Sequence, residues 1–576
     1  MNAQIPRRAL LAAGPLALAA CSQAEEAYFG RTEPPKAQRL TYVIGAQPAT
    51  LDPAKSTDRW ESYIIHAMFE GLTSLHPRTG GPMAALATHY EGTEEGVRYT
   101  FYLRGHRQPR GSRLPNTGDL PREFSRGWPA PAESGPARWS DGIPITAHDV
   151  IYSWQRALDP ATAATYSYLM HYLRNAEEIS AGRLKPDQLA LRATDDFSLQ
   201  IELRTPTPFF LQLVSHRVFC AVPRRAIEAY GSSWTDPEHI QASGAFVLRE
   251  HRPNERIVLT RNPHYYEAGI VALQEMAFFP VVDGSAAVNL YKTGHGSVVQ
   301  PLLPQLLPTL RRKKDFRAYS MFGAVFPLIN TARAPFNDVR ARYALNMATD
   351  KRAVADFVGA NRKAAFSLVP PAEGYDPPKT LPVSIDGIDC DALSFNPQAA
   401  RELFAKATGD QRPFRVEFLF PNLPEAKPVA EILQQQWKQT LGIELVLVNQ
   451  ELQNWIQTVF NKSYTGVAYW GDNGGFLDPA WFLDQFSTSS AANATGWADG
   501  RYDTMLGDAA ATPNRADRLR KLGECERYLL GAMPFVPLYT DVWTYLCKPF
   551  VKGLGANPLD VQQWKYTWID TNWRAS

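Results

Sequence analysis

The sequence predicts an α/β protein with more than one lobe. Strand and helix patterns interleave along the whole chain, which is typical of layered α/β architectures. About 555 residues follow Cys21. A hydrophobic core rarely grows beyond roughly 250–300 residues, so we expect at least two lobes. The composition, with 45% hydrophobic and 20% charged residues, is that of an ordinary globular protein.

The chain begins with a predicted export signal, residues 1–20. Arg7 and Arg8 precede a short apolar stretch, 9–20, which ends in small residues directly before Cys21. This order is typical of a secretory signal, and the cysteine at the junction adds the pattern of a bacterial lipoprotein. The stretch is too short to span a bilayer. We expect a lipid on the Cys21 thiol and a protein that works outside the cytoplasmic membrane; a plain signal peptide with a chance cysteine is the alternative.

The segment after the signal is predicted to be a flexible tether. Residues 22–38 are polar and contain two adjacent prolines. Strand patterns begin at 40–44, and another strand is predicted at 97–103, where Val97, Tyr99, Phe101 and Leu103 alternate with Arg98, Thr100 and Tyr102.

Residues 106–138 interrupt the strand pattern. They contain six prolines, six arginines and only three acidic residues, and we expect a long exposed loop. A tolerated surface insertion is one interpretation, and a docking arm for a partner or an anionic envelope polymer is the other.

One helix is predicted after Thr146. Thr146 and Asp149 have the spacing of a capping box, and Asp159 followed by Pro160 ends the pattern. The apolar face of this helix consists of Val150, Ile151, Trp154 and Leu158.

Two further helices are predicted in the second half of the chain. Asn396 is placed to cap a helix that Gly409 ends, with Pro397 in its first turn. Another helix covers 429–441 and closes at Gly442. An apolar strand, 443–448, follows directly.

Charge and cysteine content exclude several classes. The net charge is +2, which gives no support for nucleic-acid binding. The cysteines after Cys21 are widely spaced, and we expect buried free thiols rather than disulfides or a metal site. They are Cys220, Cys390, Cys525 and Cys547.

No compact catalytic motif is present. The eleven histidines are never within five positions of one another, so there is no zinc helix of the HExxH type. There is no Gly-Lys pair for a phosphate-binding loop and no G-x-S-x-G elbow. We therefore predict no enzyme activity, no cofactor and no metal. The aromatic, glycine-rich loop 469–479 is instead a candidate ligand wall, with a structural turn as the alternative.

An ordered series of motifs over nearly the whole mature chain resembles the solute-binding proteins of peptide ABC importers, the oligopeptide- and dipeptide-binding group. The series consists of Gln-Pro-Ala-Thr-Leu-Asp-Pro at 47–53, Phe-Glu-Gly-Leu at 69–72, Trp-Ser-Asp-Gly at 139–142, Thr-Ala-His-Asp-Val at 146–150, Tyr-Ser-Trp-Gln-Arg at 152–156, Pro-Thr-Pro-Phe-Phe at 206–210, Ser-Gly-Ala-Phe at 243–246, Asn-Glu-Arg at 254–256, Asn-Thr at 330–331, Ala-Pro-Phe-Asn-Asp-Val-Arg at 334–340 and Leu-Gly-Ile at 441–443.

This resemblance implies a periplasmic-binding-protein-like type II fold: two α/β lobes joined by a hinge, plus a smaller extra domain. It implies a tether at 21–38. Lobe I takes 31–69, 224–322 and 544–576, the small domain takes 70–223 with the insertion 106–138, and lobe II takes 323–543. Ligand is expected between the lobes.

The resemblance also implies a set of ligand-binding residues. The turn Ser56, Thr57, Asp58 and Arg59 is expected to pair with peptide through its main chain, and Tyr168 matches a tyrosine near the family's ligand, with a helix-core tyrosine as the alternative. Family members hold the peptide ammonium with an aspartate shortly after a tryptophan. Trp470, Asp472 and Asn473 are the match here, with Asp478 as a competitor and a turn-capping role for Asp472 as the alternative.

Departures from the family pattern leave the ligand open. Residues 467–469 stand where some relatives place an arginine for the peptide carboxylate, and Leu452 stands where a pocket tryptophan is common. The stretch 291–297 lacks the usual acidic residues, and Gln300-Pro301 replaces a more polar segment.

The leading hypothesis is a lipid-anchored, monomeric receptor in the cell envelope. It captures oligopeptides and delivers them to a permease in the cytoplasmic membrane. The alternatives are a different solute, such as a cell-wall peptide, a metal chelate or a sugar, and an envelope hydrolase using Asp472 and Asp478.

Overall fold

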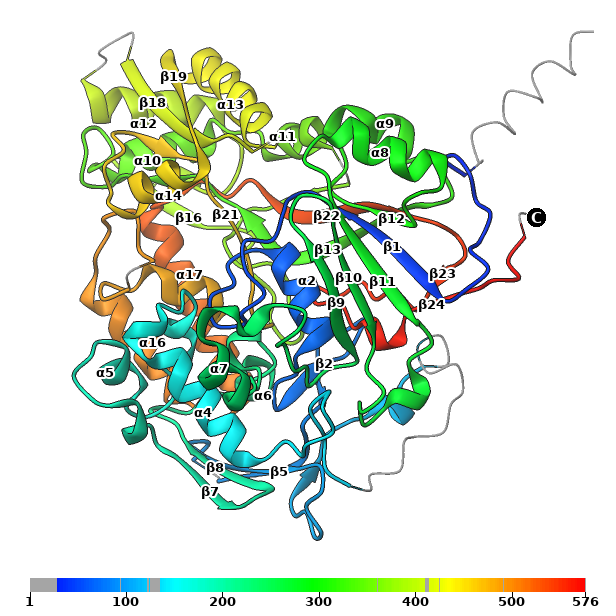
Figure 1. The fold of residues 1–576 in the computed structure, drawn as a ribbon. Coiled ribbons are helices and arrows are strands. Elements are labelled where there is room, and N and C mark those ends of the chain that lie inside the picture. The colour runs from blue at the N-terminus through cyan, green and yellow to red at the C-terminus, as the bar shows by residue number, and fades with distance from the viewer. Residues whose placement is uncertain are drawn as a thin grey trace, which may run out of the picture.

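The computed structural model describes residues 28–93, 95–121, 124, 135–359, 361–409, 414–423, 425–490 and 492–574. Three larger sheets, each covered by helices, form the protein (Figure 1). Separate hydrophobic cores lie against them. The predicted α/β class is confirmed by this arrangement.

The nine-stranded sheet combines segments from both ends of the chain. β1 is parallel to its neighbours β11 and β12, and the other pairs are antiparallel. Helices α2 (Arg59–Met68), α8 (Gly284–Thr293) and α9 (Leu307–Leu310) accompany it. The strand order is β21 (Gly471–Asn473), β13 (Phe316–Val325), β22 (Tyr539–Cys547), β12 (Val298–Val299), β1 (Arg39–Ile44), β11 (Glu275–Pro280), β10 (Arg256–Arg261) and β9 (Phe246–Arg252), with β15 (Lys363–Ala364) paired to β22.

The four-stranded sheet belongs to the second half of the chain. Its order is β14 (Leu328–Ile329), β20 (Val467–Ala468), β18 (Phe414–Pro421) and β19 (Ile443–Gln450), and β18 is parallel to β19 and β20. The surrounding core runs from Phe322 to Tyr539. Its longer helices are α10 (Val339–Met347), α11 (Lys351–Val358), α12 (Pro397–Thr408), α13 (Ala426–Leu441), α14 (Leu452–Phe460), α16 (Gly500–Ala510) and α17 (Arg515–Ala532).

The five-stranded sheet is antiparallel and lies far from the four-stranded sheet (Figure 1). Its order is β6 (Ser112–Arg113), β4 (Ala87–Gly92), β5 (Arg98–Leu103), β8 (Ser198–Glu202) and β7 (Leu191–Asp195). Helix α4 (Ala147–Leu158) packs its apolar face into the same core. The remaining elements are β2 (Thr73–Leu75), β3 (Pro82–Ala84), β16 (Pro382–Ile385), β17 (Ile388–Asp391), β23 (Val551–Lys552), β24 (Trp568–Ile569), α5 (Ala176–Ser180), α6 (Phe210–Leu213), α7 (Arg224–Tyr230) and α15 (Ala480–Leu483).

Predicted helix boundaries agree with the structure where short-range chemistry sets them. The main-chain N–H of Thr146 donates to Asp149 at 2.8 Å, as a capping box requires. Asn396 Oδ1 accepts from Ala399 N at 3.1 Å, and Gly409 ends α12 with a φ of 66°. Gly442 ends α13 in the same left-handed conformation, with a φ of 70°.

The described part of the predicted tether is packed rather than free. Phe29 N donates to Asp315 Oδ1 at 3.0 Å, Lys548 Nζ donates to Phe29 O at 3.1 Å, and Arg31 N donates to Lys292 O at 3.0 Å. The prediction of a flexible segment is therefore wrong for residues 29–31, because they hydrogen-bond to the body of the protein.

Two further groups of predictions concern the start of the chain and the cysteines. The export signal and Cys21 lie outside the described residues. Cys220, Cys390, Cys525 and Cys547 are free thiols, as predicted, although Cys390 is only partly buried. Among the residues that the structure describes, no helix has the length and apolar character of a membrane span.

Candidate ligand-binding site

Asp472 is a partly buried carboxylate at the edge of the nine-stranded sheet. It lies in β21 opposite Ala324 of β13. Its Oδ2 accepts hydrogen bonds from Trp481 Nε1, at 2.9 Å, and from Gln485 Nε2. Burial raises the pKa of this carboxyl to about 6, and the two donors oppose the rise. Within the described part of the chain no cation pairs with it, so it is suited to receive one from a ligand.

Tyr168 lies in the short segment Ser167–Met170, which packs against the core of the five-stranded sheet. The residue is 49% exposed, which rules out the alternative of a helix-core tyrosine. Desolvation raises the pKa of the Tyr168 phenol; Tyr166 and the Asp472 carboxylate add to the rise, and Arg217 opposes it. The fold therefore brings Tyr168 into electrostatic reach of a carboxylate some 300 positions away in the chain.

Arg217 is a buried guanidinium that the sequence patterns did not single out. It is 8% exposed, and its Cζ lies 4.6 Å from the ring centroid of Tyr166. Its Nη2 donates to Ser56 O at a long 3.5 Å, and its Nε has no hydrogen-bond partner among the described atoms. Burial and Arg217 together lower the pKa of His66 to about 3, which keeps that imidazole neutral.

The turn 56–59 is held by internal hydrogen bonds. Glu61 Oε2 accepts from the main-chain N–H groups of Thr57, at 2.6 Å, and Asp58, at 3.1 Å. Asp58 in turn caps α2. Tyr166 donates its hydroxyl to Thr57 O at 3.2 Å. These groups of the turn are engaged within the protein, whereas the buried Ser56 Oγ has no partner among the described atoms.

Arg59 points to a second cluster of charges. Its Cζ lies 3.5 Å from the ring centroid of Trp543, and its Nη1 is 3.4 Å from Asp560 Oδ2. Nearby, Arg362 Nη2 is 3.5 Å from Asp541 Oδ1. Arg362 Nε and Trp543 Nε1 are buried without a hydrogen-bond partner among the described atoms. This cluster therefore offers donors that a ligand acceptor would satisfy.

Asn473 follows Asp472 in β21 and packs against a glycine. A Cβ at Gly323 would lie 1.8 Å from Asn473 Oδ1, so the position requires glycine. Asn473 Oδ1 is itself buried without a hydrogen-bond partner in the described structure. The side-chain amide of Asn473 is therefore held in place by packing, and its oxygen can still accept a hydrogen bond.

Trp470 is part of an aromatic group on α14 and the adjoining loop. Its ring stacks on Trp455 with centroids 5.3 Å apart, and Phe460 meets it edge-on at 5.4 Å. Leu452, where the family commonly has a tryptophan, packs on the same core. Trp455, one helical turn after Leu452 in α14, provides the indole that stacks on Trp470.

Asp478 is excluded as a competitor of Asp472. Both of its oxygens accept from Arg518, at 2.7 and 2.9 Å. The two side chains are 11% and 3% exposed. A carboxylate used in a bidentate, buried ion pair has no charge left for a ligand.

The candidate site presents charged side chains and polar atoms without a hydrogen-bond partner among the described residues. Polar atoms in proteins are normally hydrogen-bonded when buried. The unpartnered atoms of Ser56, Arg217 and Asn473 can therefore take a partner from solvent or from a ligand. The described residues contain no group of His, Cys, Asp or Glu that could hold a metal ion. Sequence reasoning named Asp472 and Tyr168 as candidates, and their role stays a prediction. It did not name Arg217, Arg362, Trp481, Gln485 and Trp543, because none of them lies in a recognisable motif.

Comparison with protein families gives a match over most of the chain. The family model of the bacterial extracellular solute-binding proteins, family 5, covers residues 136–494. The periplasmic oligopeptide-binding protein OppA of Salmonella typhimurium is 30% identical over 570 residues, covering 96% of this chain and 97% of that protein. The periplasmic murein peptide-binding protein MppA of Escherichia coli is 28% identical over 531 residues, covering 91% and 92%.

Solved structures agree with the sequence matches. The Escherichia coli murein tripeptide binding protein MppA has a TM-score of 0.77 and 27% identity, covering 93% of this chain and 99% of that one. Haemophilus influenzae OppA in complex with RPPGFSPFR has a TM-score of 0.75 and 25% identity, covering 93% and 100%. The type II periplasmic-binding-protein fold that the motifs implied is thereby confirmed.

Proposed function

The chain belongs to the bacterial extracellular solute-binding proteins of family 5, and from that premise we propose that it captures oligopeptides between its lobes. It then delivers them to the permease of an ABC importer. The observation that carries the proposal is Asp472, a carboxylate in an enclosed setting with two neutral donors and no cation among the described residues. The amino terminus of a peptide supplies the missing positive charge.

The surroundings of Asp472 fit a ligand end better than a structural ion pair. Tyr168 is 49% exposed and lies within electrostatic reach of that carboxylate. Asn473, the next residue along β21, keeps an unused acceptor. Both groups can contact main-chain atoms of the ligand, which carry no side-chain information. Broad peptide specificity follows from contacts of this kind.

The chemistry proposed is binding without reaction. The matched relatives are named as binding proteins, and Asp478, the second carboxylate needed for the hydrolase hypothesis, is committed to Arg518. The ligand should therefore leave unchanged. Mass spectrometry of a peptide recovered after prolonged incubation with the protein tests this point, and any cleaved product would contradict it.

Membrane attachment through Cys21 completes the proposal. The basic start, the short apolar stretch and the cysteine at the junction support a lipid on the Cys21 thiol as the anchor. The protein then works as a tethered monomer on the outer side of the cytoplasmic membrane or in the periplasm, close to its permease.

A cell-wall peptide is the second candidate ligand. It is favoured by the matches to murein peptide-binding proteins, at 28% sequence identity over 531 residues and a TM-score of 0.77 for a structure. Both candidates require an ammonium partner, so Asp472 does not separate them. A competition experiment between a murein tripeptide and ordinary tripeptides for binding to the purified protein separates the two candidates.

A thermal-shift screen with mixed peptides of two to nine residues tests the main proposal. We expect stabilisation by free peptides and much weaker stabilisation by the same peptides after N-acetylation, because acetylation removes the ammonium. Stabilisation grows with ligand concentration as the binding equilibrium dictates. If no peptide, murein tripeptide included, shifts the midpoint, both ligand proposals fail; if acetylated peptides bind equally well, the role of Asp472 fails.

A further inference from the structure

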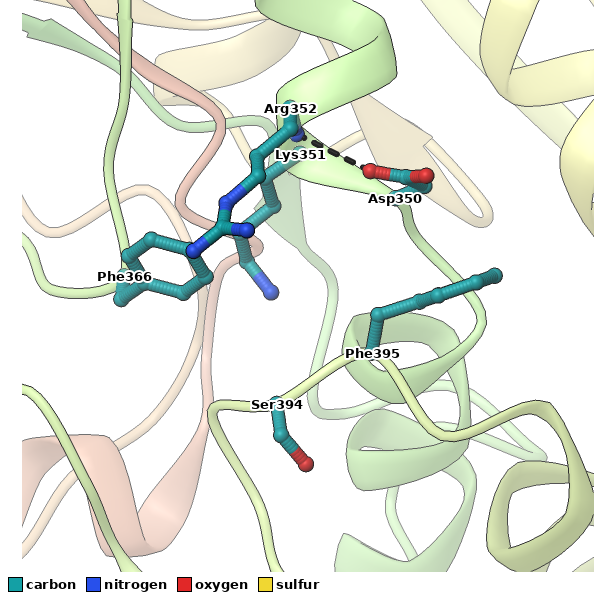
Figure 2. Close-up of a pocket in the computed structure, with 6 residues that line it drawn as sticks. All are labelled: Asp350, Lys351, Arg352, Phe366, Ser394 and Phe395. Carbon is teal, nitrogen blue, oxygen red and sulfur yellow. Dashed lines mark hydrogen bonds between the residues drawn. The ribbon is translucent and has the colours of Figure 1, made fainter.

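A pocket lies at the N-terminal end of α11, and it shares no residue with the candidate site around Asp472. Its volume is about 320 Å³, within the usual size of a small-molecule pocket. Figure 2 shows the residues that line it. They are Asp350, Lys351, Arg352, Phe366, Ser394 and Phe395.

Lys351 is the unusual member of this set, because it is only 2% exposed. Its Nζ contacts two main-chain carbonyls, Leu393 O at 3.2 Å and Asn346 O at 3.4 Å. An ammonium has three donors, so one remains without an acceptor among the described residues. In Figure 2 the amine extends into the space framed by Phe366, Ser394 and Phe395.

The carboxylates closest to Lys351 are committed elsewhere. Asp350 Oδ1 accepts from the main-chain N–H groups of Arg352, at 3.1 Å, and Ala353, at 3.0 Å, as the N-cap of α11. Asp391 Oδ1 accepts from Leu381 N at 2.7 Å and Leu393 N at 3.1 Å. Neither forms an ion pair with Lys351 in the described structure, so the buried amine has no counter-ion.

Electrostatics agree with this geometry. Burial lowers the pKa of Lys351 to about 7, and Asp391 and Asp350 oppose the shift only in part. A bound anion would restore the charged form, because a buried ammonium needs a partner of opposite charge. The exposed Arg352 and the N-terminal end of α11 add positive potential at the same place.

Two aromatic rings form part of the pocket wall, next to the charged side chains. Phe366 places its ring centroid 5.6 Å from Lys351 Nζ. Phe395 leaves 48% of its side chain exposed at the rim. Ser394 turns its hydroxyl to Asp391 O, at 2.8 Å, which leaves no donor for a ligand. The positive charges of Lys351 and Arg352 outnumber the single negative charge of Asp350, and two aromatic rings lie beside them, so the pocket favours a ligand with an anionic end and an apolar body.

We propose that this pocket binds a small amphipathic monoanion, a carboxylate on an apolar or aromatic body, with Lys351 as its counter-ion. The site lies outside the proposed peptide site and gives the protein a second ligand. Benzoate is the simplest probe of this chemistry, benzamide is its neutral counterpart, and inorganic phosphate is an anion without an apolar body.

Isothermal titration with the whole protein tests the proposal. We expect benzoate to bind and benzamide and phosphate to bind at least tenfold more weakly. At pH 8 benzoate binding should take up a proton, because the free amine is largely neutral there, so the measured heat should depend on the ionisation enthalpy of the buffer. Binding of phosphate as strong as that of benzoate, or no benzoate binding at millimolar concentration, would overturn the proposal.

Two variants locate the binding. Lys351→Met should weaken benzoate at least tenfold, whereas Lys379→Met should not, because Lys379 is 76% exposed and pairs with Asp376 on the surface. If Lys351→Met does not fold, Phe395→Ala provides the test. Phe395 is 48% exposed, so its truncation should weaken benzoate binding without affecting the fold. Unchanged affinity in the folded Lys351→Met, or in Phe395→Ala, would refute the assignment.

Discussion

Replacing Asp472 by Asn is the sharpest test of how the protein would hold a peptide. The change removes the negative charge but keeps the size of the side chain beside Trp481 and Gln485. Removing one member of a buried, hydrogen-bonded charge pair costs about 2–5 kcal/mol of binding free energy. At the lower end this corresponds to roughly a 30-fold loss of affinity.

The pH dependence gives an independent measure of the same group. The Asp472 carboxyl of the unliganded protein has a pKa of about 6, raised by burial. A peptide ammonium binds the ionised form, so affinity should be full above pH 7 and fall as the pH drops through 6. At pH 5 it should be about tenfold weaker, because about one molecule in eleven is then ionised. The Asp472→Asn variant should show no such fall.

The pH dependence of the stability of the unliganded protein has the opposite sign to that of peptide affinity. A carboxyl whose pKa is higher in the folded than in the unfolded state binds protons more tightly when folded, so its ionisation destabilises the fold. That contribution grows as the pH rises from about 4 to about 6. Unliganded Asp472→Asn should therefore unfold at the same temperature as the parent at pH 4, and at a higher one at pH 7.5.

Titration calorimetry with one free peptide and its N-acetylated form provides the assay. Acetylation should weaken binding to the parent strongly and binding to Asp472→Asn hardly at all, since the two changes remove the same interaction. Asp376→Asn is the matched control, because its side chain is 75% exposed. Equal affinity of the free peptide for parent and Asp472→Asn would refute the assignment of Asp472 to the peptide ammonium.

Three further predictions concern stability and location. Asp478→Asn should lower the free energy of unfolding by about 3–5 kcal/mol in urea titrations, because it leaves Arg518 buried without its partner. Gly323→Ala should lower it by about 1–3 kcal/mol and weaken peptide binding, because the added methyl group displaces Asn473. Cys21→Ser should move the protein from the membrane to the soluble fraction and remove the acyl mass from its amino terminus.

Matched controls accompany these three. Asp508→Asn is exposed and should leave the urea midpoint unchanged. Gly507→Ala should be neutral or stabilising, because nothing lies within 4 Å of the added Cβ. Cys390→Ser should keep the protein in the membrane fraction. A urea midpoint unchanged in Asp478→Asn or Gly323→Ala, or a membrane-bound Cys21→Ser, would contradict the corresponding reasoning.

Short-range patterns in the sequence predicted local structure well. The pairing of Thr146 with Asp149 and the stops at Gly409 and Gly442 all appear in the structure. Each rests on contacts within one or two turns of a helix, so the neighbouring residues decide it. The ordered series of motifs predicted the type II fold, which no single local pattern could have done.

The candidate site could be predicted only in part, because its chemistry depends on partners far along the chain. The sequence favoured Asp472 but left Asp478 as a competitor, and only the fold shows that Arg518 neutralises Asp478. Arg217 meets Tyr166 only through the fold. The sequence likewise did not show that the main-chain N–H groups of Thr57 and Asp58 donate hydrogen bonds to Glu61, which lies in the helix that follows. The lobe boundaries and the ligand contacts stay predictions.

The register shift in β13 has a mechanical consequence. Residues 316–320 of this strand pair with one stretch of β22 beside the core of the nine-stranded sheet, and residues 324–325 pair with another stretch beside the core of the four-stranded sheet. We expect a movement of one lobe against the other to bend the chain where the ladder is interrupted, at 321–323. β21 is attached beyond that point and the turn before α2 is attached on the near side. If the protein holds a peptide as proposed, bending at this point would change the distance between Asp472 and Thr57 and would weaken the contacts with the ligand on both sides.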